Sequence, residues 1–226
     1  TKIDKTVKKN GEKVSRKRVQ RRMSVLGIKS VVVKKYKPLR VEKNIKEKEN
    51  ILNQDFTTTS INQKWSADIT YIHTEKDGWT YLASVEDLYS RKIIGWAFGK
   101  TMDAELAKKA LKNASLNIKK TKGIILQTDL GSQYTSNIFE EYLAELKIRH
   151  SYSRKGCPYD NSCIESFHSI LKKEEVNLKK YKDFKEAYNA IFEFIEAWYN
   201  RERIHSCLNY KTPDEVHSED EESFAA

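Results

Sequence analysis

The sequence predicts an α/β fold in which a mixed sheet is flanked by helices and preceded by a basic helical arm. Strand-like apolar runs come three in a row and then alternate with helical periodicities. Charge is divided just as clearly. Residues 1–50 hold 18 Lys/Arg and 5 Asp/Glu, a net of +13, whereas residues 51–226 hold 24 Lys/Arg and 27 Asp/Glu, a net of −3. A basic arm on a near-neutral body indicates a polyanionic partner, DNA or RNA first.

The arm and its linker are expected to occupy residues 1–48. One helix is predicted from Lys13 to Leu26, with Ser15 as its N-cap and Gly27 as the residue that ends it. Residues 29–48 are interpreted as a linker that contains a β-like valine triplet. The cations expected to contact DNA phosphates from the helix are Arg16, Lys17, Arg18, Arg21 and Arg22.

The body is expected to span residues 49–213 and to open with an antiparallel meander, because the turns between its first three strands are short. Helices and strands then alternate. This βββ-α-β-α-β-α-α order is typical of a ribonuclease-H-like mixed sheet. The predicted strands are Trp65–His73, Trp79–Glu86, Lys92–Phe98, Gly123–Thr128 and Ile148–Tyr152, and the predicted helices are Asp103–Asn117, Ile138–Leu146, Asp160 or Asn161 to Glu175, and Phe184–Asn200.

Composition limits the classes of protein to which the chain can belong. Residues 214–226 carry six acids and no Lys or Arg, which favours a disordered tail. The sequence contains no apolar run near the roughly 18 residues of a membrane span, and no signal-peptide pattern. Three cysteines without a CxxC pair argue against a disulfide scaffold or a zinc site. We therefore expect a cytoplasmic protein.

Three acids stand in different segments of the predicted body. Asp68 lies within the first strand, where Asp is disfavoured, Asp129 follows the fourth strand and precedes a glycine, and Glu165 lies one turn into a helix. Each has an ordinary explanation by itself: an edge acid, a turn former and a surface glutamate.

Together the three acids predict one site. In the expected fold the first and fourth strands are neighbours, so Asp68 and Asp129 can meet, and the later helix can bring Glu165 to the same place. Three adjacent carboxylates without a counterion would repel one another. Two divalent cations about 3.5–4 Å apart would neutralise them and can drive phosphodiester chemistry.

The motifs resemble the transposases of the IS3 family of bacterial insertion sequences, part of the DDE transposase and retroviral integrase superfamily. The resemblance covers about residues 50–215 and includes a gap of 35 residues between Asp129 and Glu165. The basic region before residue 50 is also similar to that family. The matching stretches are NQKWSADITYI, GWTYLASVEDLYSRKIIGWAF, TDLGSQYTS, SRKGCPYDNSCIESFHSILKKE and YNRERIHSCLNYKTP.

The resemblance implies that Asp68, Asp129 and Glu165 are catalytic metal ligands for Mg²⁺ or Mn²⁺, two ions per site. It implies cleavage of double-stranded DNA at the terminal repeats and transfer to target DNA by the freed 3′-hydroxyl, in a copy-out–paste-in route. It also implies a homodimer or larger paired-end complex, and a helix-turn-helix region upstream of Thr1. Leu130, where many members have Arg, and Cys157-Pro158 depart from the family pattern.

Other residues are expected to assist. Lys172, two turns after Glu165, resembles the integrase lysine that contacts the DNA end, and Arg154 and Lys155 are expected DNA contacts in the loop before the helix. His168 is either near the metals or a surface histidine. Asp87 is either a fourth candidate acid or, as we favour, a structural residue paired with Arg91. The tryptophans Trp65, Trp79, Trp96 and Trp198 are expected in the core or in helix packing.

Two other functions fit part of the pattern. A non-catalytic DNA-binding or repressor fragment would account for the basic arm equally well. A ribonuclease H or junction nuclease would share the fold. The 35-residue gap and the YDNSCIES segment favour the transposase.

Overall fold

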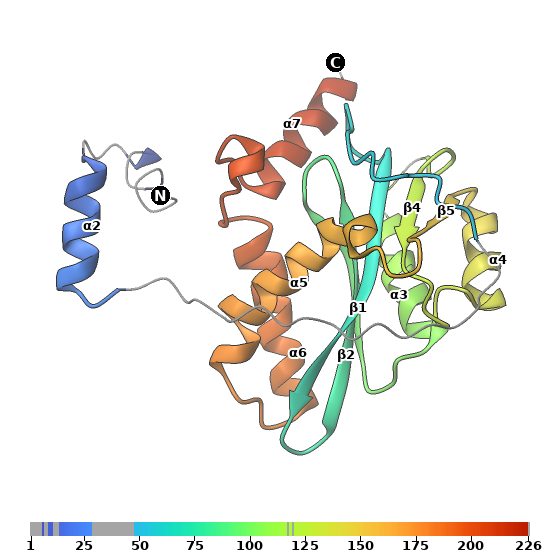
Figure 1. Ribbon diagram of the computed structural model, residues 1–226, viewed down its shortest axis with the longest axis horizontal. Coiled ribbons are helices and arrows are strands. Elements are labelled where there is room, and N and C mark those ends of the chain that lie inside the picture. The colour runs from blue at the N-terminus through green and yellow to red at the C-terminus, as the bar shows by residue number, and fades with distance from the viewer. Residues whose placement is uncertain are drawn as a thin grey trace.

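A computed structural model describes residues 6, 9–10, 14–28, 48–116, 118 and 120–225. Its centre is a five-stranded sheet with the order β3-β2-β1-β4-β5 (Figure 1). The mixed sheet expected from the sequence is therefore present. Its strands are β1 (Lys64–Thr74), β2 (Gly78–Asp87), β3 (Ile93–Gly99), β4 (Ile125–Thr128) and β5 (Arg149–Tyr152).

The strand directions follow from the connections. Strands β1, β2 and β3 pair antiparallel, as their short turns predict. Strand β4 returns parallel to β1 after the helix α3 (Ala104–Ser115), and β5 returns parallel to β4 after α4 (Asn137–Leu146). Because β4 is short, it pairs only with the start of β1, and the rest of β1 extends past it.

Helices cover both faces of the sheet and bury its apolar residues (Figure 1). On one face α3 and α4 pack over a cluster that includes Trp65, Leu111 and Phe139. On the other face α5 and α6 pack over a cluster that includes Ile72 and Phe167. The remaining helical elements are α5 (Ser162–Glu174), α6 (Phe184–Phe192), the π-helical continuation η3 (Glu193–Tyr199), α7 (Pro213–Ala225), and the 3₁₀ turns η1 (Pro158–Asn161), η2 (Val176–Leu178) and η4 (Ser206–Leu208).

The predicted arm helix is present as α2 (Arg16–Val25). The Ser15 hydroxyl accepts a hydrogen bond from the Arg18 amide at 3.3 Å, which confirms the N-cap. Gly27 has φ +66° at the end of the helix, a backbone conformation that favours glycine. Residues 29–47 of the predicted linker, with the valine triplet, lie outside the described residues.

The tail differs from the prediction of disorder, since α7 occupies most of it. The helix begins with a reciprocal cap, in which the Glu215 amide donates to the Thr212 hydroxyl at 3.2 Å and the Thr212 amide donates to the Glu215 carboxylate at 2.8 Å. His217 is buried, and Asp220 accepts from the Ile61 amide at 3.0 Å. Capping and docking onto the body outweigh the repulsion among the acids.

The tryptophans divide into two groups. Trp65 is fully buried, and Trp96 packs against Tyr188 and donates to Glu196 at 2.8 Å, as expected of core and helix-packing residues. Trp79 is 54% exposed, so the core interpretation is wrong for this residue. Trp198 is 42% exposed, so it is only partly packed within the helix layer.

Within the described residues, no helix combines the length and apolar character needed to cross a membrane.

Candidate active site

Two parallel strands place the first two acids side by side. The parallel pairing of β1 with β4 runs from Lys64↔Ile125 to Ser66↔Gln127. Asp68 and Asp129 each lie two residues beyond the last pair, so the register sets them level with each other. Strand β4 has ended by then, which leaves Asp129 at its carboxyl end and Asp68 on the uncovered edge of β1.

A tight turn fixes the Asp129 carboxylate. The Gly131 amide donates to Asp129 Oδ1 at 2.9 Å. A Cβ atom on Gly131 would lie 2.3 Å from Gln133 Nε2 and 2.9 Å from Asp129 Oδ1, so a larger residue would push these two side chains aside. Gly131 therefore helps to set the position of the Asp129 carboxylate.

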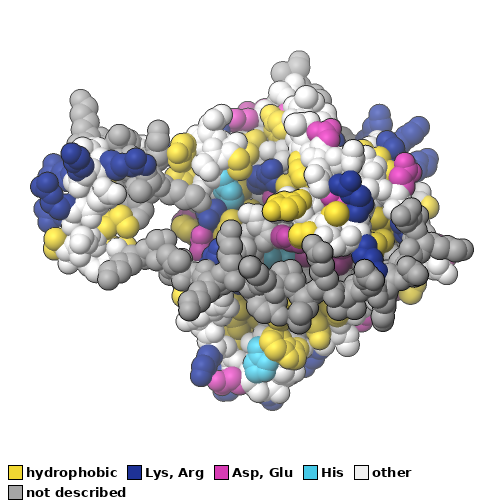
Figure 2. All heavy atoms as spheres, viewed as in Figure 1, with side chains coloured by type: hydrophobic (Ala, Val, Ile, Leu, Met, Phe, Trp, Pro, Cys, Tyr) yellow, Lys and Arg dark blue, Asp and Glu magenta, His cyan; other side chains and the backbone are white. Residues whose placement is uncertain are grey.

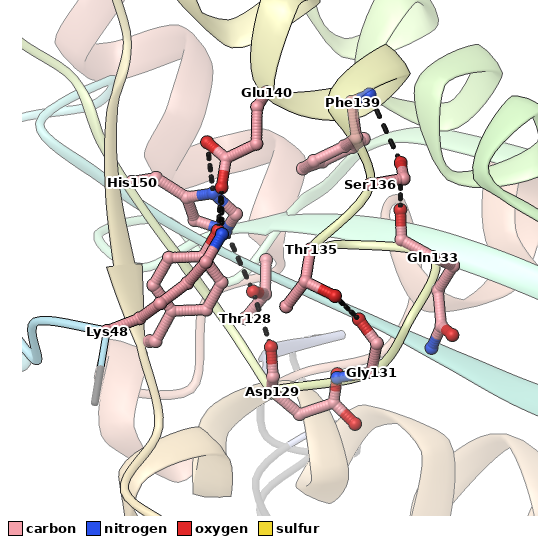
Figure 3. A network of polar contacts seen from close by, with 11 residues as sticks. Lys48, Thr128, Asp129, Gly131, Gln133, Thr135, Ser136, Phe139, Glu140 and His150 are labelled. Carbon is pink, nitrogen blue, oxygen red and sulfur yellow. Dashed lines mark hydrogen bonds and ion pairs between the residues drawn. The ribbon is translucent and has the colours of Figure 1, made fainter. Parts of the chain in front are cut away.

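A network of polar contacts also supports the turn after Asp129 (Figure 3). The Thr128 hydroxyl donates to the Asp129 carbonyl at 2.9 Å and lies 2.9 Å from His150 Nε2. His150 Nδ1 lies 3.3 Å from Glu140, and Lys48 pairs with Glu140 at the far end. The network joins the start of the body to β4, α4 and β5 around Asp129.

Helix α5 carries the third acid and is anchored on β1. The Ser66 hydroxyl donates to Asn161 Oδ1 at 2.6 Å, and both residues are buried. Glu165 follows one turn later. The preceding loop is closed by Asp160, whose carboxylate accepts from the Arg154 amide at 2.8 Å and from its guanidinium at 3.0 Å.

The three carboxylates interact electrostatically. Burial, and secondarily the charge of Asp68, raise the pKa of Asp129. Burial, and then the charges of Asp68 and Asp129, raise the pKa of Glu165. Each effect disfavours the ionised form of the acid, so the ionised site is a region of negative potential that attracts a cation.

The residues present fit a divalent cation by their chemistry. Carboxylate oxygens are the ligands that Mg²⁺ and Mn²⁺ prefer. Tyr134 Oη is buried beside Asp68 and Asp129 and has no hydrogen-bond partner in the described part of the chain. In that same part no group of three His, Cys, Asp or Glu side chains is close enough to form a ready-made metal cluster. The three acids share a neighbourhood, since the charge of Asp68 acts on both Asp129 and Glu165.

His168 lies beside the first acid and is not a surface residue. Its Nδ1 atom is 3.4 Å from Asp68 Oδ2, its Nε2 atom is 2.8 Å from Ser84 Oγ, and the side chain is buried. Asp68 and Ser84 are cross-strand partners. His168 therefore bridges two strands at the site. The only sequence signal was its position three residues after Glu165, on the same helix face.

The expected DNA contacts differ in their surroundings. Lys172 is partly buried, with Nζ 4.0 Å from the centre of the Tyr71 ring. Burial lowers its pKa, and the nearby charge of Asp68 acts in the opposite direction. Arg154 is held by Asp160, while Lys155 is exposed. The predicted cations of α2 are exposed, and within the described residues no hydrogen bond or ion pair joins them to the three acids: Arg16, Lys17, Arg18, Arg21 and Arg22.

Asp87 is structural, as expected, although its partners differ from the prediction. Its carboxylate accepts from the Ser90 amide and hydroxyl, each at 2.9 Å, and from the Asn62 amide at 2.8 Å. Arg91 instead lies 3.8 Å from Glu86. Asp87 thus holds the turn between β2 and β3 and takes no part in the site.

Comparisons with known proteins decide the family. Two models described as "Integrase core domain" match residues 58–158 and 146–213. The transposase for insertion sequence element IS904 of Lactococcus lactis is 38% identical over 93% of this chain and 83% of its own length. The chain belongs to the IS3 family of integrase-core transposases. Transposase InsF for insertion sequence IS3A of Escherichia coli is also 38% identical, over 84% of this chain and 66% of its own length.

Solved structures agree on the fold of this transposase. The integrase catalytic core of HTLV-2, solved in complex with magnesium, has a TM-score of 0.52 at 19% identity and covers 69% of this chain and 96% of its own. A chain of the simian T-cell lymphotropic virus intasome has a TM-score of 0.53 at 21% identity over 69% of this chain and 54% of its own. The ribonuclease-H-like fold is confirmed. By its family the chain is a DNA transposase and a polynucleotidyl transferase.

Proposed function

We propose that this chain cleaves DNA at the ends of an insertion sequence and joins the freed 3′-hydroxyl to target DNA, with Asp68, Asp129 and Glu165 as the catalytic acids. The observation that carries the proposal is that these acids, two from neighbouring strands and one from α5, share one neighbourhood. Burial, and then the charge of Asp68, raise the pKa values of both Asp129 and Glu165 there. A non-catalytic DNA-binding protein has no need for such an arrangement.

The three acids are proposed to hold two Mg²⁺ or Mn²⁺ ions. When bound, such ions neutralise the scissile phosphate and lower the pKa of an attacking water or hydroxyl. Three protein features prepare the acids for this task. Gly131 fixes Asp129, the Ser66–Asn161 hydrogen bond sets α5 and therefore Glu165, and His168 holds Asp68 toward β2.

The DNA partners are proposed to be double-stranded terminal repeats and target DNA. The cationic face of α2 would lie against phosphates, and Lys172 would hold a phosphate near the acids. Lys155 would contact DNA from the loop before α5. Arg154 would also contact DNA, because its side chain remains about half exposed while it pairs with Asp160. We divide the chain accordingly into a DNA-binding arm and linker at 1–48 and a catalytic core at 49–213.

Two ends must be joined, so we propose a homodimer or larger paired-end complex. The copy-out–paste-in route implied by the family remains part of the proposal, as does a bacterial cytoplasmic site of action on the nucleoid.

A strand-transfer assay tests the function. An oligonucleotide duplex carrying the element end is incubated with target DNA, Mg²⁺ and either wild type or Asp129→Asn. The wild type is expected to form joined product and the variant to lose at least about 10²-fold in rate. The matched control is Glu145→Gln, an exposed glutamate on α4, which should retain wild-type activity. Joined product at the wild-type rate from Asp129→Asn would refute the site assignment.

A further inference from the structure

The β1–β2 hairpin has one covered face, whereas its other face is exposed near the turn and packs against the cluster under α3 and α4 at Ile69 and Tyr81. Its register pairs His73 with Trp79 and Tyr71 with Tyr81, so these side chains project from the same face. The alternate residues Ile72 and Thr80 point the other way and are 1% and 0% exposed, beneath the cluster that includes α6. On the exposed part of the other face Tyr71 is 56% and Trp79 is 54% exposed.

Tyr71, His73 and Trp79 form what we call the hairpin patch. The Tyr71 and Trp79 ring centres are 5.1 Å apart with the planes at 87°, and the His73 and Trp79 centres are 5.0 Å apart at 79°. Edge-to-face contacts of this kind hold each ring in place. Figure 2 shows hydrophobic and histidine side chains together on the surface in the lower part of the view, where Figure 1 has the hairpin.

The hairpin patch is continuous with the active site. Lys172 Nζ lies over the Tyr71 ring at 4.0 Å, and the same ammonium group interacts with the charge of Asp68. Tyr71 follows Asp68 by three residues on β1, about 10 Å along the strand, so the two side chains project from opposite faces of the sheet. Lys172 connects the two faces, because it extends from α5 to the Tyr71 ring where β4 leaves the edge of β1 uncovered. A DNA strand that passes from the acids around this edge meets Lys172 first and then the three rings.

The chemistry of the hairpin patch discriminates among possible occupants. Duplex DNA presents a phosphate backbone, which calls for several cations, whereas the patch offers flat apolar rings with one ammonium group at the border nearest the acids. An unpaired DNA strand carries both features that this surface matches, a phosphate for Lys172 and bases for the aromatic side chains.

We propose that the hairpin patch binds unpaired bases of the DNA strand next to the scissile phosphate by stacking on Tyr71 and Trp79. This inference rests on the proposed function, because it takes DNA at the three acids as given. It adds a surface that would favour frayed or single-stranded element ends over closed duplex.

Binding of tailed oligonucleotides tests the proposal. Three duplexes are compared by fluorescence anisotropy: one blunt, one with a short single-stranded tail, and one whose tail keeps its phosphates but has abasic sugars. Wild type should bind the base-containing tail about ten-fold more tightly than the abasic tail. Trp79→Leu and Tyr71→Leu should each remove most of that difference, whereas Trp79→Phe, which keeps a ring, should retain it. Phe192→Leu, at an exposed aromatic outside the patch, is the matched control.

Two results would overturn the proposal. If Trp79→Leu and Tyr71→Leu weaken the binding of base-containing and abasic tails equally, the rings contribute to phosphate contacts or to folding and not to base stacking. Thermal unfolding of each variant shows whether folding is affected. A change in oligomeric state with unchanged tail preference would assign the hairpin patch to a second copy of the chain. Asp129→Asn separates this inference from the proposed function, because it should lose strand transfer and keep the preference for the base-containing tail.

Discussion

His168 is the residue whose role the structure most changes. It is wedged between Asp68 and Ser84, so it sets the orientation of the first acid and acts as a positioning residue. His168→Ala should lower kcat for strand transfer by about 10–100-fold, the usual effect of removing a group that orients a metal ligand. KM for DNA should be unchanged. A rise in KM with normal kcat would instead make His168 a DNA contact.

The buried charge of Asp129 is expected to lower the free energy of unfolding when no metal is bound. Its raised pKa means that the folded state disfavours its charge. Asp129→Asn should therefore raise the free energy of unfolding by about 1 kcal/mol in EDTA, measured by urea denaturation at pH 8. Mg²⁺ should then stabilise wild type more than the variant. A variant less stable than wild type in EDTA would contradict the electrostatic account.

Glu86 should make stability fall as pH rises. Burial raises its pKa from 4.5 to about 7, and its Oε2 atom has no hydrogen-bond partner among the described residues. Between these two pH values the folded state binds more protons than the unfolded state, so stability is greatest below pH 4.5 and is lost as pH approaches and passes 7.

Glu86→Gln should reduce this pH-dependent loss in the free energy of unfolding. The reduction is up to about 1.4 kcal/mol for each unit by which the folded-state pKa of Glu86 exceeds its unfolded value. Thermal or urea unfolding from pH 5 to pH 8 measures it. Identical slopes for wild type and Glu86→Gln would show that another group causes the loss.

The resemblance to the IS3 family assigned the three acids as metal ligands. Residue type and strand order indicated only that these acids could share one site, because Asp is disfavoured within a strand. They did not predict His168, since a single histidine on a helix is compatible with either face. They also misassigned Trp79. A large aromatic in an alternating strand is normally buried, and only the end of β4 shows that this part of the sheet lacks a covering layer.

At the scale of elements, the attachment of α5 to β1 is decisive because the helix carries Glu165, His168 and Lys172. Asn161 is the attachment point, and its Oδ1 atom accepts from Ser66 at 2.6 Å. Asn161→Ala should destabilise the fold by about 1–3 kcal/mol, because it leaves the buried Ser66 hydroxyl without its acceptor.

Strand transfer by Asn161→Ala should fall further than the loss of folded protein explains, and circular dichroism with an activity assay separates the two effects. The variant Asn161→Asp, which keeps an acceptor, should recover part of the activity. Activity proportional to the folded fraction in both variants would mean that Asn161 has no role in placing Glu165.

Periodicity and turn residues predicted every strand of the sheet and nearly every helix, with ends shifted by at most three residues. The exceptions have local causes. The helix after Phe184 changes to π-helical geometry at Glu193. Composition suggested a disordered tail, but the Thr212–Glu215 cap and contacts to the body start a helix there.

At the scale of the whole molecule, charge is separated, with a net of +13 in the first 50 residues and three acids at the candidate site in the body. Changing Arg18 and Arg21 together to Ala should weaken DNA binding. It should also reduce the slope of log K against log salt by up to about 2 if both side chains contact phosphates. Anisotropy across a salt series measures this, and an unchanged slope would remove α2 from the DNA interface.

The central claim is that Asp68, Asp129 and Glu165 form one metal-dependent centre. The most direct measurement counts Mn²⁺ ions bound per chain in the complex with element-end DNA, by electron paramagnetic resonance. The account predicts two ions for wild type, and fewer than two for Asp68→Asn, Asp129→Asn and Glu165→Gln. The control Glu145→Gln should bind two. Two ions bound to all three acid variants would contradict the account.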